Sequence, residues 1–217
     1  MHQVFLLYAL FASLFSISKS TLGHCEPFFF IGSRMAFAGL LMLTYELRKN
    51  PRSWKIIVKG WIPLTLLAIF NIYLTNIAEI WGIKHMISAR ACLLYSLSPF
   101  FSALFSYFLL KETLSPKKWM GLTIGFCGII PATYQYITDY SGHSFLELGE
   151  LSLLVAILSS VYGWILLQRV IKEYECTPFL ANGFSMTLGG ALALVHSYLG
   201  GESWAPTPVT NWQPFII

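Results

Sequence analysis

The sequence PFFFIGSRMAFAGLLML, residues 27–43, recurs in altered form as PFLANGFSMTLGGALAL, residues 178–194. At this offset of 151 residues, seven of the seventeen positions are identical. Shared leucines mean little in two apolar segments, but a proline and two glycines in register are hard to obtain by chance. The registered pairs are Pro27 with Pro178, Gly32 with Gly183, and Gly39 with Gly190. The sequence therefore predicts an internal repeat.

The composition places this repeat in a membrane. Of the 217 residues, 56% are hydrophobic and only 11% are charged, whereas a globular domain carries about 25% charged residues. This balance excludes a disordered chain and disfavours a soluble one, and a net charge of +4 is too sparse for a nucleic-acid binder. Six stretches without Asp, Glu, Lys or Arg are 18 to 26 residues long, close to the ~20 residues that span a bilayer as a helix.

The predicted fold is an all-α, polytopic membrane protein with seven transmembrane helices in this chain. The first segment lacks a basic start and a small-x-small cleavage site, so we expect it to be a retained helix and not a signal peptide. The expected helices cover residues 3–20, 27–46, 61–83, 87–110, 118–137, 150–169 and 178–199.

The offset also predicts how the helices are grouped. It makes the sixth helix the partner of the first and the seventh the partner of the second, so the repeat unit has five helices. An odd number of spans inverts the second unit, as in many secondary transporters. We therefore expect a first repeat in 1–137, an external linker in 138–149 and an incomplete second repeat in 150–217. A full second copy would end near residue ~288, so we expect a ten-helix carrier of which this chain holds seven helices.

The basic residues predict the orientation. Ten of the fourteen Lys and Arg residues lie in the loops after the second, fourth and sixth helices, and the loop 138–149 has none. By the positive-inside rule these three loops and the N-terminus are cytoplasmic. The ten are Arg48, Lys49, Arg52, Lys55, Lys59, Lys111, Lys117, Lys118, Arg169 and Lys172.

Three features together resemble the EamA-type carriers of the drug/metabolite transporter superfamily. One is Pro27 followed by Arg34; the second is Leu97-Ser98-Pro99 with the sequence LLKETL at 109–114. The third is a tryptophan and three glycines that open the fifth helix. The resemblance implies ten helices in two inverted five-helix halves. The charge of Arg34 is not duplicated, because its repeat mate is Ser185. The tryptophan and the three glycines at the start of the fifth helix are Trp119, Gly121, Gly125 and Gly128.

Within that superfamily, the residues YALFA at 8–12 and SISK at 16–19 are similar to S-adenosylmethionine carriers of obligate intracellular bacteria. The resemblance implies a secondary transporter of a small polar metabolite in the bacterial inner membrane. Exchange of S-adenosylmethionine for S-adenosylhomocysteine is the first expectation, and a drug, metabolite or amino-acid exporter of the same superfamily is the alternative.

Four ionisable residues fall in the outer half of the first repeat. Arg34 lies ~10 Å from the outer end of its helix, Glu79 and Arg90 lie ~7 Å from theirs, and Lys19 ends the first helix. Charges inside a membrane are expensive and usually face a partner or a water-filled cavity. We interpret Arg34 first as a structural ion-pair partner and Lys19 as an interfacial anchor, with substrate binding as the alternative for both.

For Glu79 and Arg90 we favour substrate binding or gating over a purely structural ion pair. Arg90 would bind a carboxylate or phosphate, and Glu79 would pair with an ammonium group. Asn76 shares the Glu79 face, and Tyr95 lies about one turn beyond Arg90, where its ring could contact a purine or a sulfonium. The glycines of 121–128 and Gly189-Gly190 suit close helix packing.

Other function classes lack their motifs. The chain has no H-E-x-x-H, no G-x-S-x-G and no Walker A sequence, and its four cysteines form no C-x-x-C pair. A channel would need a filter-like loop or a ring of charges, and neither is visible. We therefore expect no catalysis, no metal and no cofactor. The expected partners are a small-molecule metabolite and membrane lipid, but no nucleic acid.

Overall fold

The computed structural model describes residues 26–86, 91, 94–111, 115–139, 148–202 and 204, with backbone alone for 129–139. All regular structure in these residues is helical, as the sequence predicts, while the predicted helix 3–20 lies outside them. The elements are α2 (Pro27–Lys49), α3 (Ser53–Lys59), α4 (Trp61–Leu67), the π-helical segment η1 (Ala68–Leu74), α5 (Thr75–Lys84), α7 (Ser98–Leu110), α8 (Pro116–Asp139), α9 (Leu148–Tyr174) and α10 (Pro178–Leu199).

Four of the described helical stretches are long and apolar enough to cross a membrane: Pro27–Lys49, Trp61–Lys84, Leu148–Tyr174 and Pro178–Leu199. The stretch Trp61–Lys84 joins α4, η1 and α5 without a break. At 1.5 Å per residue, even the shortest, with 22 residues, is ~33 Å long, which matches a hydrocarbon core of ~30 Å. The chain is therefore a multi-pass membrane protein, as predicted.

The predicted helix 87–110 is interrupted in the structure. Positions 91, 94 and 95 are helical, a turn follows at Ser96-Leu97, and α7 begins at Ser98. The cause is Pro99 at the start of α7, which has no amide hydrogen to donate to the carbonyl one turn earlier. The interruption separates Tyr95 from the regular part of α7.

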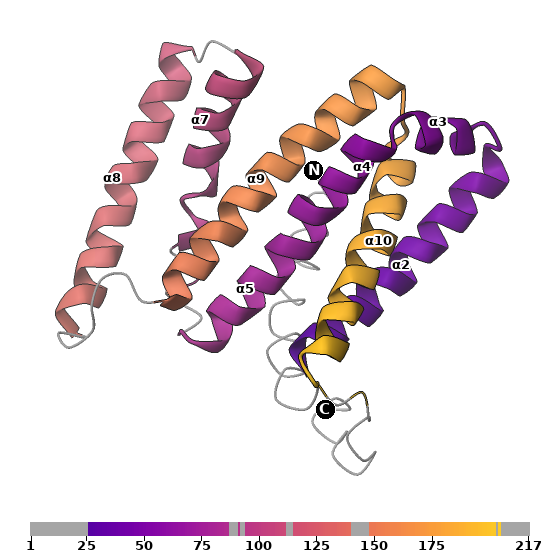
Figure 1. Ribbon diagram of the computed structural model, residues 1–217. Coiled ribbons are helices and arrows are strands. Elements are labelled where there is room, and N and C mark those ends of the chain that lie inside the picture. Colours follow the sequence, from indigo (N-terminus) through magenta and orange to yellow (C-terminus); the bar gives the residue numbers. More distant parts are fainter. Residues whose placement is uncertain are drawn as a thin grey trace, which may run out of the picture.

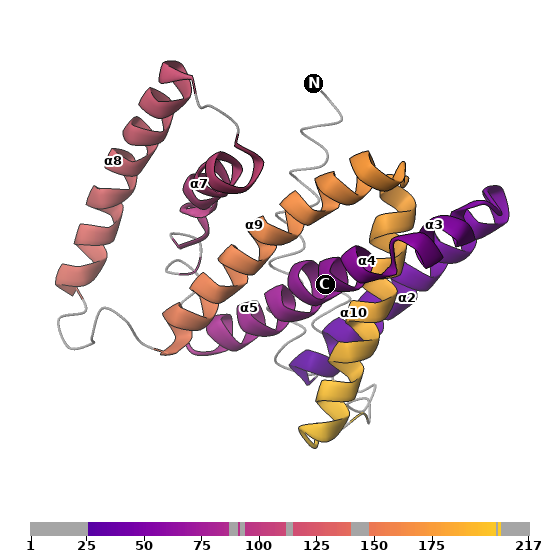
Figure 2. The same ribbon diagram turned by 45° about the horizontal axis from the view of Figure 1, so that its top comes forward.

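Two antiparallel helix pairs form the centre of the bundle. In Figures 1 and 2 the run from α4 to α5 lies beside α9, and α2 lies beside α10, in agreement with the dominant helix contacts. Helices α7 and α8 lie on the far side of α9 (Figure 1). The most deeply buried side chains, such as Leu64, Leu67 and Leu180, lie where α3, α4, α9 and α10 meet.

The described parts of the three basic connections lie at one end of this bundle. Figure 1 shows α3, the last turn of α7 beside the first turn of α8, and the turn between α9 and α10 at the same end. Helix α3 occupies part of a stretch that the sequence predicts as a loop. It buries Ser53 and Ile57 against the bundle and exposes Trp54 and Val58, which is the arrangement of a helix at a membrane surface.

Helices α2 and α10 pack along a seam of glycines. A β-carbon on any of four glycines would overlap the backbone of the other helix. Each glycine contact is matched by a second one between the residues 151 positions away, so that the glycine lies on the other helix of the pair. This is the contact pattern of two similar helices around an approximate two-fold axis. The pairs are Gly32 with Leu194, Gly183 with Leu43, Gly39 with Thr187, and Gly190 with Ala36.

A carboxylate stabilises the N-terminus of α2. Glu202, which follows α10, accepts hydrogen bonds from the backbone N–H groups of Phe28 (3.3 Å) and Phe29 (2.9 Å). These are amides that a helix cannot satisfy internally, and a negative charge there is favourable. Ser197 donates to the same carboxylate over 2.7 Å and accepts from the indole of Trp204 over 3.1 Å.

The opposite end of the seam has a related arrangement. Thr177 caps α10 by accepting from the N–H of Leu180 (3.2 Å), and its hydroxyl donates to the buried carboxylate of Glu46 near the end of α2 (3.0 Å). Asn50 also donates to Glu46, over 3.1 Å. Each end of the α2–α10 pair thus joins the start of one helix to the end of the other.

Among the residues that the structure describes, the glycines of α8 do not show the close packing that the sequence predicts. Within the described residues, a β-carbon on Gly121 or Gly128 would meet nothing within 4 Å, and one on Gly125 would lie 3.7 Å from the ring of Phe100. Composition alone led to this prediction, and glycine permits close packing but does not require it. The prediction for Gly189 and Gly190 is confirmed, since Gly189 contacts Ile72 and Gly190 contacts α2.

Candidate functional site

A polar cluster forms where α2, α5 and the segment before α7 meet. The Tyr95 hydroxyl donates a hydrogen bond to the carboxylate of Glu79, which lies on α5. The guanidinium of Arg34, on α2, interacts electrostatically with the same carboxylate. Its Cζ lies 5.5 Å from the centre of the Phe30 ring, one turn earlier on α2. Three of the six residues predicted from sequence are therefore brought together.

The cluster combines opposite charges with an aromatic ring inside the span of the bundle. A carboxylate at this depth is stable only with partners, and Tyr95 and Arg34 supply a hydrogen bond and a positive charge. The same groups suit a zwitterionic ligand, because a carboxylate binds ammonium, a guanidinium binds carboxylate in a fork, and a tyrosine ring attracts a cation. The interrupted helix before Pro99 presents Tyr95 to this cluster.

Of the other three predicted residues, the structure describes Asn76 alone. Asn76 lies on α5, but its side-chain amide donates to the backbone carbonyl of Ile72 over 2.6 Å. Arg90 and Lys19 lie outside the described residues.

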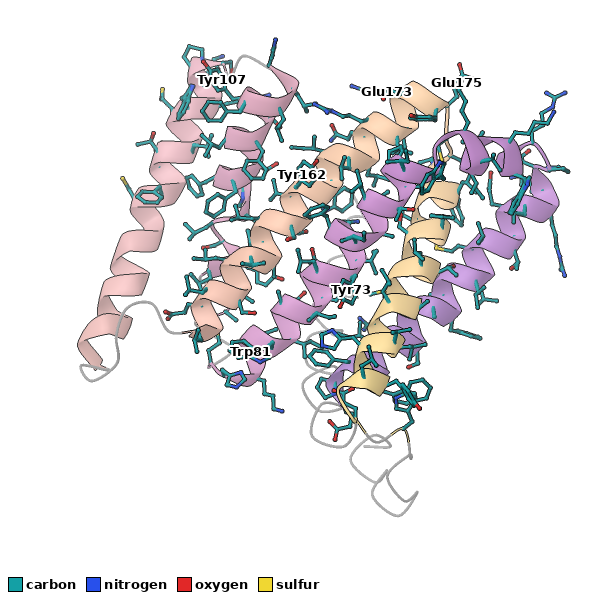
Figure 3. All side chains as sticks on the ribbon, in the orientation of Figure 1. Tyr73, Trp81, Tyr107, Tyr162, Glu173 and Glu175 are labelled. Carbon is teal, nitrogen blue, oxygen red and sulfur yellow. The ribbon has the colours of Figure 1, made fainter. Side chains whose placement is uncertain are left out.

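A second contact, which the sequence does not predict, links the two central helix pairs. The Tyr73 hydroxyl and Nδ1 of His196 are 2.9 Å apart, and the ring of Phe28 lies 4.9 Å from the His196 ring, centre to centre. In Figure 3, Tyr73 lies between α5 and α10. These residues are more than a hundred positions apart, so no local pattern could reveal the contact.

The π-helical segment η1 positions Tyr73. The wider turn is closed by the Thr75 hydroxyl, which donates to the carbonyl of Phe70 five residues earlier, over 2.7 Å. Gly163 of α9 lets the backbone approach Asn71, since a β-carbon there would lie 2.7 Å from the Asn71 side-chain oxygen. Such π-segments occur often at functional sites, because they rotate the following residues relative to a regular helix.

Two observations on the described residues bear on metal and thiol chemistry. No group of three or more His, Cys, Asp or Glu residues among them is placed to hold a metal ion. Cys176, between α9 and α10, is buried, and this burial raises the pKa of its thiol to about 11. The thiol is therefore protonated at neutral pH, and a protonated thiol is a poor nucleophile and metal ligand.

Comparisons with known proteins assign the chain to a family. Residues 2–134 match the model of the EamA-like transporter family. The chain is 34% identical to an S-adenosylmethionine/S-adenosylhomocysteine transporter of Chlamydia muridarum, over 98% of this chain and 67% of that protein. It is also 34% identical to a transporter of the same name in Chlamydia trachomatis serovar L2, over 98% of this chain and 65% of that protein.

An uncharacterized transporter of Synechocystis is 28% identical over 89% of this chain and 62% of its own length. The chain thus spans about two thirds of the length of the curated relatives it matches. The family match covers more than half of the chain and includes both α2 and α5, which carry Arg34 and Glu79. The chain belongs to the EamA-like transporter family.

Proposed function

We propose that this protein is a secondary transporter that exchanges S-adenosylmethionine for S-adenosylhomocysteine across a bacterial inner membrane. The observation that carries the proposal is the 34% identity to two chlamydial transporters of that name over 98% of the chain. A transporter of either ligand must recognise an amino-acid end and a purine end.

The polar cluster supports this substrate class. S-adenosylmethionine carries an ammonium, a carboxylate, a sulfonium and an adenine ring. Glu79 would pair with the ammonium, Tyr95 would offer its ring to the sulfonium or the purine, and Arg90 would bind the carboxylate. Arg34 holds a second positive charge beside Glu79 and would stabilise its ionised form when no substrate is bound.

The repeat supports a transport mechanism. We infer that residues 1–137 and the stretch from 150 onward are two inverted repeats, joined by an external linker at 138–149. The reciprocal contacts of α2 and α10 support this division, because mates at the 151-residue offset exchange roles in them. In carriers with such repeats the substrate site lies near the midplane between the halves, and access alternates by motion of one half against the other.

A counterflow assay tests the exchange. Cells that express the complete protein should take up labelled S-adenosylmethionine, and preloading with S-adenosylhomocysteine should accelerate that uptake severalfold. Methionine or adenosine alone should compete weakly, because each lacks one end of the recognised ligand. If preloading with S-adenosylhomocysteine does not change the rate of uptake, or if free methionine is preferred, the result would favour the alternative, an exporter of the same superfamily.

Cysteine labelling tests the orientation. We propose that the end of the bundle with α3 is cytoplasmic, because its connections hold most of the basic residues. In a cysteine-free background, Lys84→Cys at the opposite end should react with a membrane-impermeant maleimide in intact cells. Arg52→Cys should react only after the membrane is opened, and labelling of Arg52→Cys from outside would contradict the topology. Both native residues are exposed in the structure.

A further inference from the structure

The structure contains a groove that the polar cluster does not use. It has a volume of about 380 Å³ and is bounded by α7, α9 and η1. Its walls are aromatic or aliphatic apart from one serine, with Phe105 and Phe108 on α7 and Tyr162 on α9 (Figure 3). Tyr162 meets the ring of Phe70 edge-on at 5.0 Å, which closes the groove toward the centre of the bundle.

One rim of the groove is basic. Leu109 lines the groove, and its backbone carbonyl accepts a hydrogen bond from Nη2 of Arg169 over 2.8 Å. Lys172 lies three residues further along α9, hence on the same side, and Lys111 follows the last residue of α7. All three basic side chains are exposed.

Acidic residues do not cancel this charge. The sequence stretches 109–118 and 169–175, which include the basic residues of this rim, contain five basic and three acidic residues. Two of the acidic residues, Glu173 and Glu175, lie at the end of α9 (Figure 3). The basic residues are Lys111, Lys117, Lys118, Arg169 and Lys172.

The length of the groove matches one leaflet of a bilayer. Leu158 is the lining residue of α9 farthest from Arg169, and the two residues are eleven positions apart, which is ~16 Å along a helix. Half of a hydrocarbon core is ~15 Å. An acyl chain in the groove would therefore extend from the midplane to the level at which a phosphate meets Arg169.

We propose that this groove binds an anionic phospholipid, with an acyl chain between α7 and α9 and its phosphate at Arg169, Lys172 and Lys111. The occupant follows from the combination of an apolar wall at membrane depth with a positive rim at the headgroup level. Basic pockets between transmembrane helices recognise anionic headgroups in this way. A guanidinium has five N–H donors, so Arg169 can hold the Leu109 carbonyl and still donate to a phosphate.

Native mass spectrometry of the complete protein tests the site. With phosphatidylglycerol and phosphatidylcholine of identical chains at equal concentration, phosphatidylglycerol adducts should predominate at least fivefold. Lys172→Gln should reduce these adducts about fivefold, the equivalent of ~1 kcal/mol for one basic residue. Lys55→Gln, on α3 at the same end of the bundle, is the matched control and should leave them unchanged.

Further measurements separate the contribution of the lipid's acyl chain from that of its headgroup. Glycerol phosphate, which has no acyl chain, should give no adduct, and Ser159→Phe should reduce phosphatidylglycerol adducts by filling the groove without changing any charge. Arg169→Lys should retain most adducts and Arg169→Gln should not. Equal amounts of adduct with both lipids would overturn the proposal, because the groove would then not select an anionic lipid. Equal losses in Lys172→Gln and Lys55→Gln would also overturn it, because lipids would then respond only to the general positive charge at this end of the bundle.

Discussion

Replacing Glu79 by glutamine is expected to lower substrate uptake about thirtyfold or more, while the amount of folded protein in the membrane stays near wild type. Glutamine still accepts a hydrogen bond from Tyr95, but it carries no charge for an ammonium group. Truncating one partner of a buried charge pair costs ~2–5 kcal/mol, and 2 kcal/mol corresponds to about thirtyfold. Uptake of labelled S-adenosylmethionine, normalised to the folded protein, measures the effect.

Glu173→Gln is the matched control for this change. It removes the same charge from an exposed position at the far end of α9 (Figure 3) and should leave uptake within about twofold. Tyr95→Phe removes the hydroxyl and keeps the ring, so a severalfold loss would assign that part of the effect to the bond with Glu79. Normal uptake in a well-folded Glu79→Gln protein would eliminate the proposed role of this carboxylate.

A double-mutant cycle separates substrate binding from a structural ion pair. If Arg34 and Glu79 only hold helices together, each single alanine change leaves a buried charge unpaired, and the double change should restore both folding and uptake. If Glu79 binds substrate, Arg34→Ala with Glu79→Ala should restore folding but not uptake. The electrostatic interaction between the two residues makes this pair the informative one.

Much of the fold follows from the sequence because a membrane imposes simple rules. Long stretches without charged residues predicted the long helices, and Pro27 and Pro178 correctly mark the first residues of α2 and α10. Ser115 before Pro116 likewise accepts from the N–H of Lys118, over 3.4 Å, at the start of α8. These features depend on neighbouring residues, which is why a single sequence reveals them.

The candidate site was only partly predictable. The depth of a residue within its own helix follows from the neighbouring sequence, but its contacts with other helices do not. Counting residues from helix ends placed Arg34 and Glu79 at similar depths, and in the structure they lie within range of an electrostatic interaction. It could not show that a π-helical segment rotates Tyr73 toward His196, since the wider turn depends on the packing of Gly163 against Asn71. Nor could the sequence distinguish the closely packed glycines of α2 and α10 from the glycines of α8, because the packing of a glycine depends on the helix that lies against it.

Those two kinds of glycine lead to a prediction of large effect on stability. Gly39→Ala and Gly190→Ala should each lower the melting temperature and the yield of folded protein strongly, because the new β-carbon would overlap the backbone of Thr187 or Ala36. Added methylenes in a packed core cost ~1–3 kcal/mol, and a clash with backbone lies at the upper end because a helix axis must move. Thermal unfolding in detergent, followed by size-exclusion chromatography, measures the loss.

The chain supplies its own controls. Gly121→Ala and Gly128→Ala make the same chemical change where a β-carbon meets none of the described residues within 4 Å, so they should be neutral or stabilising by up to ~1 kcal/mol through helix propensity. Because Gly39 and Gly190 are mates at the 151-residue offset, their alanine variants should have similar effects. The double variant should cost less than the sum, since either change alone already separates α2 from α10. Wild-type stability of Gly39→Ala would show that this seam is not closely packed, and would remove the contact evidence for the inverted repeat.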